Sequence, residues 1–163
     1  MNHTTVIMGV CGSGKTTVGT ALAKRLDCRF LEGDAFHPPA NVEKMRIGLA
    51  LDDSDRWPWL DEIGRELMSL RDSGPAVLAC SALKYCYRER LRSFGVPLAF
   101  VYLEVPVTVL EARLDDRKGH YMSPSLLKSQ LKILEKGDDL VEVEAVKEPS
   151  QIVEDILEAF GKL

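Results

Sequence analysis

The sequence lacks the features on which exported, membrane-spanning and nucleic-acid-binding proteins depend. It has no excess of basic residues: its formal net charge is -4 and its pI is about 5.4, whereas nucleic acids and anionic membranes select clustered positive charge. It has no long hydrophobic run, and its first apolar stretch, residues 6–8, is far shorter than a signal-peptide core or a membrane span. We therefore expect a cytoplasmic protein whose partners include neither a nucleic acid nor a membrane.

The sequence also lacks paired cysteines, internal repeats and linkers. Its four cysteines, Cys11, Cys28, Cys80 and Cys86, show no C-x-x-C spacing, so we expect reduced thiols. No stretch is low in complexity, or rich enough in Gly, Pro and Ser to divide domains. Because 163 residues suffice for one domain with a substantial core and not for two, we expect a single domain over residues 1–163.

Short apolar runs alternate along the chain with longer helical patterns, the order typical of βαβ units and a parallel sheet. The expected strands are residues 5–8, 29–31, 76–80, 99–103 and 140–143, and the expected helices begin near Lys15, Val42, Trp59, Tyr85, Val107, Pro124 and Ser150. A short basic stretch, residues 117–125, separates two of these helical patterns and fits a lid. The pattern therefore predicts an α/β fold.

Residues 9–16, GVCGSGKT, match the phosphate-binding pattern G-x-x-x-x-G-K-[ST], directly after an apolar strand and before a helical pattern. Glycines let successive backbone N–H groups turn inward on phosphates, and the following helix presents its positive end to the same anions. We expect Lys15 to reach the β- and γ-phosphates and the Thr16 hydroxyl to bind Mg²⁺. The expected nucleotide-binding set is Gly9, Val10, Cys11, Gly12, Ser13, Gly14, Lys15, Thr16 and Thr17.

Phosphate-binding loops of this kind also occur in GTPases, ATP-driven machines and regulatory modules. The sequence has no N-K-x-D guanine-specificity motif, and it is too short for a motor. A small-molecule kinase is therefore the leading class, and a regulatory module that binds a nucleotide and a partner protein is the alternative.

Asp34 follows the second expected strand, at the sheet edge where ligands of open parallel sheets gather. In phosphoryl transfer a carboxylate there accepts the proton of a substrate hydroxyl or holds a water on Mg²⁺. An aspartate that caps the next turn is the alternative. His37, three residues further on, is either a substrate ligand or a structural hydrogen-bond partner.

Residues 51–60, LDDSDRWPWL, concentrate acids, one arginine and both tryptophans. The Asp and Ser residues ahead of Trp-Pro-Trp indicate a helix start, and Arg56 offers a planar fork for a substrate carboxylate. After the third expected strand, Lys84 and Arg88 lie four residues apart on one helix face, which aims both at one anion. A solvated basic face is the alternative for this pair.

Together these residues resemble the gluconate kinases, or gluconokinases, of the shikimate-kinase and adenylate-kinase-like group of P-loop kinases. The resemblance covers nearly the whole chain and rests on the phosphate-binding loop, the GDAFHP stretch at 33–38, Asn41 with residues 43–45, the segments 53–60 and 113–120, and residues 80–84 with 87–88. The sequence departs from the family at Ala50, where a proline is usual, and at residues 136–139, where we assign no nucleotide contact.

The resemblance implies a three-layer α/β/α P-loop NTPase fold with a five-stranded parallel sheet and a short helical lid at about 113–135. It implies ATP and Mg²⁺ as cofactors and phosphorylation of the C6 hydroxyl of D-gluconate, giving 6-phospho-D-gluconate and ADP. A homodimer is also expected, since dimers are common in the family. A shikimate-like acceptor is the alternative within the same fold.

The resemblance also implies roles for individual residues. Lys15, Asp34 and Arg117 are the expected catalytic residues, and Arg113 is expected near the adenine or the phosphates. The expected gluconate ligands are Asp34, His37, Arg56, Lys84, Arg88 and His120. Arg117 and His120 belong to the lid, and Asp34 replaces the Mg²⁺-associated acid that many P-loop enzymes carry after the third strand.

Overall fold

The computed structural model describes residues 3–116 and 124–161 of the 163-residue chain. Five parallel strands form a sheet in the order β2-β3-β1-β4-β5. The strands are β1 (Thr4–Met8), β2 (Arg29–Glu32), β3 (Ala76–Ala79), β4 (Leu98–Glu104) and β5 (Leu140–Glu144). All five lie where the alternation of apolar runs predicts them, within one residue at each end.

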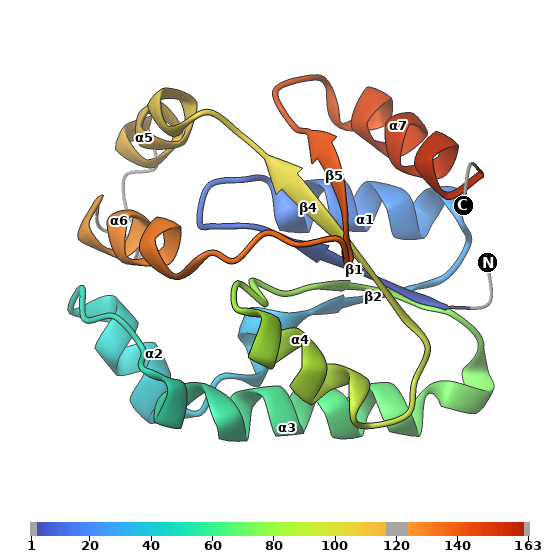
Figure 1. Cartoon of the computed structure of the whole chain (residues 1–163), viewed down its shortest axis with the longest axis horizontal. Coiled ribbons are helices and arrows are strands. Elements are labelled where there is room, and N and C mark those ends of the chain that lie inside the picture. The colour runs from blue at the N-terminus through green and yellow to red at the C-terminus, as the bar shows by residue number, and fades with distance from the viewer. Residues whose placement is uncertain (1–2, 117–123, 162–163) are drawn as a thin grey trace.

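Helices cover both faces of this sheet, as Figure 1 shows: α1 and α7 lie on one face, and α3 and α4 on the other. Within the described ranges the helices are α1 (Lys15–Arg25), α2 (Pro39–Arg46), α3 (Asp53–Ser69), α4 (Tyr85–Arg92), α5 (Val107–Asp116), α6 (Pro124–Ile133) and α7 (Pro149–Gly161), with short 3₁₀ turns at Gly33–Phe36 and Arg71–Ser73. The predicted three-layer α/β/α fold is confirmed.

The central strand β1 is buried on both faces, as expected for a parallel sheet covered by two helical layers. Alternate side chains of β1 enter different cores: Val6 and Met8 pack in the cluster that contains Trp59 of α3, and Ile7 packs in the cluster that contains Ile156 of α7. This alternation follows from the two-residue period of a strand. It places a rigid, fully covered element directly ahead of the phosphate-binding loop.

Two helices begin earlier than the sequence pattern predicts. α2 begins at Pro39 rather than near Val42, because a proline is well suited to the first helical position. α3 begins at Asp53 rather than near Trp59, because the Asp52 side chain accepts from the Asp55 backbone N–H and forms a capping box. The proline that the interpretation placed at a helix start, Pro58, therefore lies inside α3.

Helices α2, α5 and α6 gather beyond the carboxyl ends of the strands, at the left of Figure 1. The last residues of α5, from 113 on, and α6 belong to the predicted lid at about 113–135, and the residues between these helices, 117–123, lie outside the described ranges. Arg117 and His120 therefore keep the roles predicted for them without a structural description.

Two further expectations concern the thiols and the membrane. All four cysteines are free of disulfide bonds in the structure, and their reduced state stays a prediction. Among the helices of the described residues, none is long and apolar enough to cross a membrane.

Candidate active site

A cavity at the carboxyl ends of the strands brings together side chains from five parts of the chain. It is lined by Cys11 and Lys15 of the phosphate-binding loop, Asp34 and His37 after β2, Met45, Ala50, Leu51 and Arg56 around α2 and α3, Ser81 after β3, and Leu126, Ser129 and Gln130 of α6. Five predicted ligand or catalytic residues, Cys11, Lys15, Asp34, His37 and Arg56, thus share one cavity. Its place matches the crevice where open α/β sheets bind ligands.

The loop between β1 and α1 has the backbone that a phosphate site needs. Gly9 and Gly14 have φ angles of 151° and 94°, which side-chain-bearing residues rarely adopt, and a Cβ on Gly9 would lie 2.7 Å from Ser13 Oγ. α1 follows with no side chain capping its first turn. Its first N–H groups and the positive end of its dipole therefore remain available for an anion.

Two polar groups of this loop, one charged and one buried, lack an ion-pair partner and a hydrogen-bond partner, respectively, among the described residues. The Lys15 ammonium donates to the Val10 carbonyl at 3.0 Å and makes no ion pair within the described residues. Ser13 Oγ is buried without a hydrogen-bond partner in the same part of the chain. A buried hydroxyl and an uncompensated ammonium beside inward-turned N–H groups fit an anionic ligand.

Thr16, the predicted magnesium ligand, is hydrogen-bonded to an acid that the sequence interpretation passed over. Its hydroxyl donates to Glu32 Oε2 at 2.6 Å, and Glu32 is the last residue of β2. Residues 3–116 and 124–161 contain no group of three His, Cys, Asp or Glu side chains that would enclose a metal. The Thr16–Glu32 pair fits Mg²⁺, since this ion binds through one or two protein ligands and takes its other oxygens from phosphates and water.

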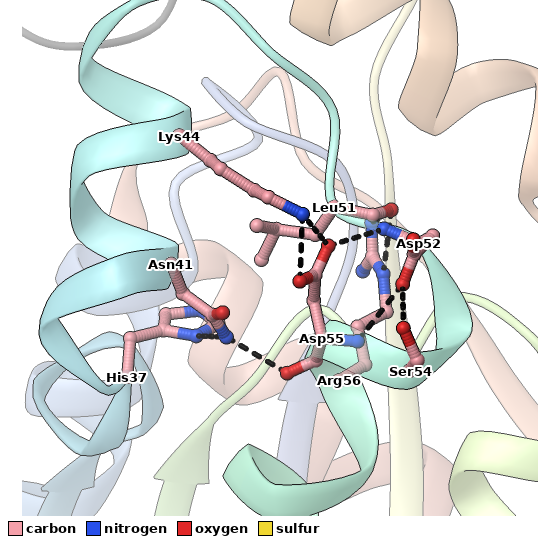
Figure 2. Close-up of polar contacts among 8 residues, drawn as sticks. All are labelled: His37, Asn41, Lys44, Leu51, Asp52, Ser54, Asp55 and Arg56. Carbon is pink, nitrogen blue, oxygen red and sulfur yellow. Dashed lines mark hydrogen bonds and ion pairs between the residues drawn. The ribbon is translucent and has the colours of Figure 1, made fainter.

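The residues after β2 form a rigid wall of the cavity, shown in part in Figure 2. The His37 ring stacks on Trp59 with centroids 4.2 Å apart, and Trp59 Nε1 donates to the Gly33 carbonyl at 2.8 Å. Asn41 Nδ2 donates to the Asp55 carbonyl at 2.8 Å and lies 3.2 Å from His37 Nδ1. Since an amide nitrogen only donates, Nδ1 is the acceptor and Nε2 carries the proton of the neutral ring.

That proton faces the predicted catalytic carboxylate. His37 Nε2 lies 3.8 Å from Asp34 Oδ1, and the Asp34 side chain is exposed while the His37 side chain is buried. Burial lowers the pKa of His37 from 6.5 to about 4, an effect that the Asp34 charge opposes and the Arg56 charge reinforces. His37 is therefore a neutral hydrogen-bond donor at pH 7, beside a carboxylate that is open to a ligand.

Arg56 is a buried cation without a carboxylate partner among the described residues. The residue is 5% exposed; its Nε and Nη2 donate to the Leu51 carbonyl at 3.3 Å, and its guanidinium carbon lies 5.3 Å from the centre of the Tyr87 ring. A buried charge without an ion pair is costly, and the charge of Asp53 interacts with this guanidinium only at longer range. The site therefore contains a positive charge that forms no ion pair within the described residues, and an anionic ligand would neutralise it.

The expectation that Lys84 and Arg88 address one anion is wrong. Lys84 Nζ donates to Asp53 Oδ1 at 2.8 Å, an oxygen that also accepts from the Tyr87 hydroxyl. Arg88 is fully buried, and its Nε and Nη2 donate to Asp139 at 2.7 and 3.1 Å. Lys84, the extended N-cap of α4, and Arg88, within the helix, thus bind different carboxylates.

Arg88 is also satisfied by the backbone, because Nη1 donates to the Ala82 and Leu83 carbonyls at 3.2 Å. Its carboxylate partner, Asp139, comes from the region where the sequence departs from the family. The guanidinium is therefore a structural tie between the loop after β3 and the segment ahead of β5. Lys84 is partly exposed and retains its predicted role.

Arg113 lies against the phosphate-binding loop, as predicted. Its Nη1 donates to the Gly12 carbonyl at 3.0 Å and its Nη2 donates to the Ala145 carbonyl at 3.2 Å. The side chain therefore bridges the loop after β1 and the loop after β5. Contact with a nucleotide stays a prediction for Arg113.

One cavity residue had no signal in the sequence. Gln130 of α6 accepts a hydrogen bond from the Cys11 backbone N–H through Oε1, at 2.7 Å. The two residues are 119 positions apart, and nothing in the local pattern around Gln130 distinguishes it from other polar residues on a helix.

Comparison with known proteins agrees with this geometry. The shikimate kinase family matches residues 11–160. The gluconokinase of Gluconobacter oxydans strain 621H is 49% identical over 95% of this chain and 89% of its own length, and the thermoresistant gluconokinase of Escherichia coli K12 is 41% identical over 87% and 82%. The crystal structure of a gluconokinase from Sinorhizobium meliloti 1021 superposes with a TM-score of 0.86 at 43% identity, covering 99% of this chain and 93% of that one. The chain therefore belongs to the shikimate kinase family and, within it, to the gluconokinases.

Proposed function

We propose that this chain is a gluconokinase that transfers the γ-phosphoryl group of ATP to the C6 hydroxyl of D-gluconate, giving 6-phospho-D-gluconate and ADP. It is thus a phosphotransferase with an alcohol group as acceptor. The buried, unmatched Arg56 guanidinium carries the proposal, because it calls for an acceptor that is an acid. Membership of the gluconokinases supports gluconate as that acid.

On the nucleotide side, the inward-turned backbone and Lys15 would bind the phosphates of ATP. Thr16 and Glu32 would hold the magnesium ion, which neutralises charge on the phosphate oxygens when it is bound. Arg113 would contact the nucleotide, and its hydrogen bond to the Gly12 carbonyl supports this. The lid residue Arg117 would supply a further positive charge to the transferring oxygens.

On the acceptor side, Arg56 would bind the gluconate carboxylate and His37 would donate to a hydroxyl oxygen through Nε2–H. Lys84 and His120 are further proposed ligands of the acceptor. Asp34 would orient the C6 hydroxyl and accept its proton as the oxygen bonds to the γ-phosphorus and the bond to the β–γ bridging oxygen breaks. Because such a transition state is loose, Asp34 contributes through positioning as much as through basicity.

The position of the new phosphate tests this proposal. Wild-type protein is incubated with Mg-ATP and D-gluconate, and the product is examined by proton–phosphorus correlation NMR. The expected result is a single phosphoester whose phosphorus couples to the two protons on C6. A product phosphorylated elsewhere, or no acceptor-dependent product, would overturn the assignment.

A shikimate-like acceptor remains the second candidate, since the shikimate kinase family matches residues 11–160 and an unmatched arginine suits any carboxylic acid. Substrate profiling separates the two. The cytoplasmic location and the homodimer also stay predictions, and light scattering on the purified protein tests the second.

A further inference from the structure

Among the hydrogen bonds of the described residues, one joins α6 to the phosphate-binding loop, and Gln130 makes it. Its Oε1 accepts from the Cys11 N–H at 2.7 Å, and the two neighbouring leucines, Leu126 and Leu127, bury α6 against the body of the protein. The side chain is therefore held at both ends, by a packed helix and by a backbone N–H. A polar group fixed in this way is suited to recognition.

The contact also determines which way the amide of Gln130 faces. The Cys11 backbone nitrogen is a donor, so the atom that it meets must be the amide oxygen and not the amide nitrogen. The two hydrogens on Nε2 are then left for another partner, and within residues 3–116 and 124–161 Nε2 makes no hydrogen bond to the protein. Gln130 lines the cavity that also contains Lys15, Asp34 and Arg56.

The charges around this amide suggest what it binds. Lys15 and Arg56 supply positive charge for the phosphates and the acceptor carboxylate, and Asp34 is suited to accept a hydroxyl proton. A neutral amide that offers only hydrogens matches the oxygen of an uncharged hydroxyl group. A polyhydroxy acid carries several such oxygens between its carboxylate and the reacting end.

We propose that Gln130 is an acceptor-binding, specificity-determining residue: anchored by the Cys11 N–H, its amide NH₂ donates a hydrogen bond to one hydroxyl oxygen of the polyhydroxy acid. This rests on the proposed function for the class of acceptor. It adds a ligand from α6, on the lid side of the cavity, to those after β2 and on α3. The Gln130 side chain would thereby bind both the acceptor and the phosphate-binding loop.

Two substitutions distinguish the role of the amide oxygen from that of the amide NH₂ group. Gln130→Glu keeps an oxygen for the Cys11 N–H and removes the NH₂ donor. Gln130→Met has a side chain of similar length and removes both the oxygen and the NH₂ group. Lys132→Ala, exposed on the same helix, is the matched control. We expect both Gln130 variants to raise KM for gluconate about tenfold, as for loss of one hydrogen bond, and to leave KM for Mg-ATP within about threefold.

Monodeoxy analogues of gluconate then distinguish a lost hydrogen bond from a general disturbance. For the analogue that lacks the hydroxyl bound by Gln130, wild type and Gln130→Met are expected to have kcat/KM values within about twofold of each other. Calorimetric titration of gluconate in the presence of Mg-ADP should show the same tenfold loss of affinity without turnover. If every analogue suffers the same loss as gluconate, the proposal is wrong.

Other outcomes would also overturn it. An unchanged KM for gluconate in Gln130→Glu, or a lower KM for Mg-ATP in Gln130→Met with gluconate unaffected, would show that Gln130 only occupies the empty phosphate-binding loop. If the wild-type protein phosphorylates a different acid, the proposed function is wrong. The Gln130 variants are then tested in the same way on that acid and its deoxy analogues. Absence of turnover with any acid would overturn both.

Discussion

His37 makes the stability of this protein depend on pH in a window that its environment defines. Burial lowers its pKa from 6.5 to about 4 in the folded state. The unfolded chain therefore binds the proton first as the pH falls. The stabilising contribution is complete above pH 6.5 and is lost between pH 6.5 and about 4, and the difference in pKa corresponds to roughly 3 kcal/mol of unfolding free energy.

The variant His37→Gln removes this titration. At pH 4.5 the wild type should have lost about 2.5 kcal/mol of unfolding free energy through His37 relative to pH 7.5, and the variant should not show this part of the loss. Urea unfolding followed by tryptophan fluorescence at several pH values measures both curves. Carboxylates distant from His37 that titrate in the same window cancel in the difference between the two proteins, whereas Asp34, whose charge acts on His37, contributes to that difference.

The readout is the change in this difference with pH, because loss of stacking on Trp59 destabilises the variant at every pH. His3→Gln is the matched control: His3 lies against Phe160, so this variant keeps the titration of His37. Parallel pH profiles for wild type and His37→Gln would refute the reasoning, since they would mean that the imidazole is not desolvated in the folded protein.

Four further predictions concern named side chains. Asp34→Asn should lose most turnover, by about a hundredfold or more, and keep its affinity for ATP; unchanged turnover would remove Asp34 from the mechanism. Arg56→Gln should raise KM for gluconate ten- to a hundredfold and leave KM for Mg-ATP nearly constant, since a charge-assisted contact to the acceptor is lost; equal effects on both substrates would contradict the assignment. Arg88→Ala should cost about 2–4 kcal/mol in urea unfolding, because it removes a fully buried side chain and its bonds to Asp139, which keeps only its second partner Arg92, whereas Arg90→Ala, which breaks an exposed pair, should cost at most about 1 kcal/mol; similar losses would argue against a structural role for the Arg88–Asp139 pair. Glu32→Gln should raise the Mg²⁺ concentration needed for half-maximal activity several-fold, and an unchanged magnesium titration would show that this carboxylate does not support the ion.

Local patterns explain why so much of the fold was predictable. The five strands and the phosphate-binding loop are encoded in short contiguous stretches, where apolar runs and glycine spacing reflect the backbone directly. Asp34 and His37 were likewise identified because they follow a strand whose end could be located, and Arg56 because it lies in the unusual run of acids and tryptophans at residues 51–60. The sheet then brings them to one cavity, since the carboxyl ends of parallel strands lie at one edge.

Contacts between residues far apart in the sequence could not be predicted from the sequence. The prediction that Lys84 and Arg88 share a helix face is wrong, since Lys84 is the extended N-cap of α4, and their partners come from different parts of the chain: Asp139 lies 51 residues from Arg88. A buried ion pair of this kind leaves no local periodic signal. The bond from Gln130 to Cys11 was not predictable for the same reason, although a helix beginning near Pro124 was predicted.

Glu32 illustrates a signal that was present and not used. It directly precedes the Gly-Asp pair that attracted the interpretation to Asp34, and it ends a strand adjacent in space to the phosphate-binding loop. Because side chains alternate along a strand, the last residue of β2 and the second residue after it were both candidates for the edge of the cleft. Weighing each acid at that strand end would have included Glu32.

The central claim, phosphoryl transfer from ATP to gluconate, is tested most directly by an ADP-release assay. Purified protein with Mg-ATP is offered D-gluconate, shikimate, glucose, glycerate and AMP in separate reactions, and kcat/KM is determined for each. The account predicts ADP release that depends on D-gluconate, with a kcat/KM well above that for every other member of the panel. Higher turnover with shikimate or another acceptor would contradict gluconate as the substrate, and ADP release that no acceptor stimulates would contradict the kinase itself.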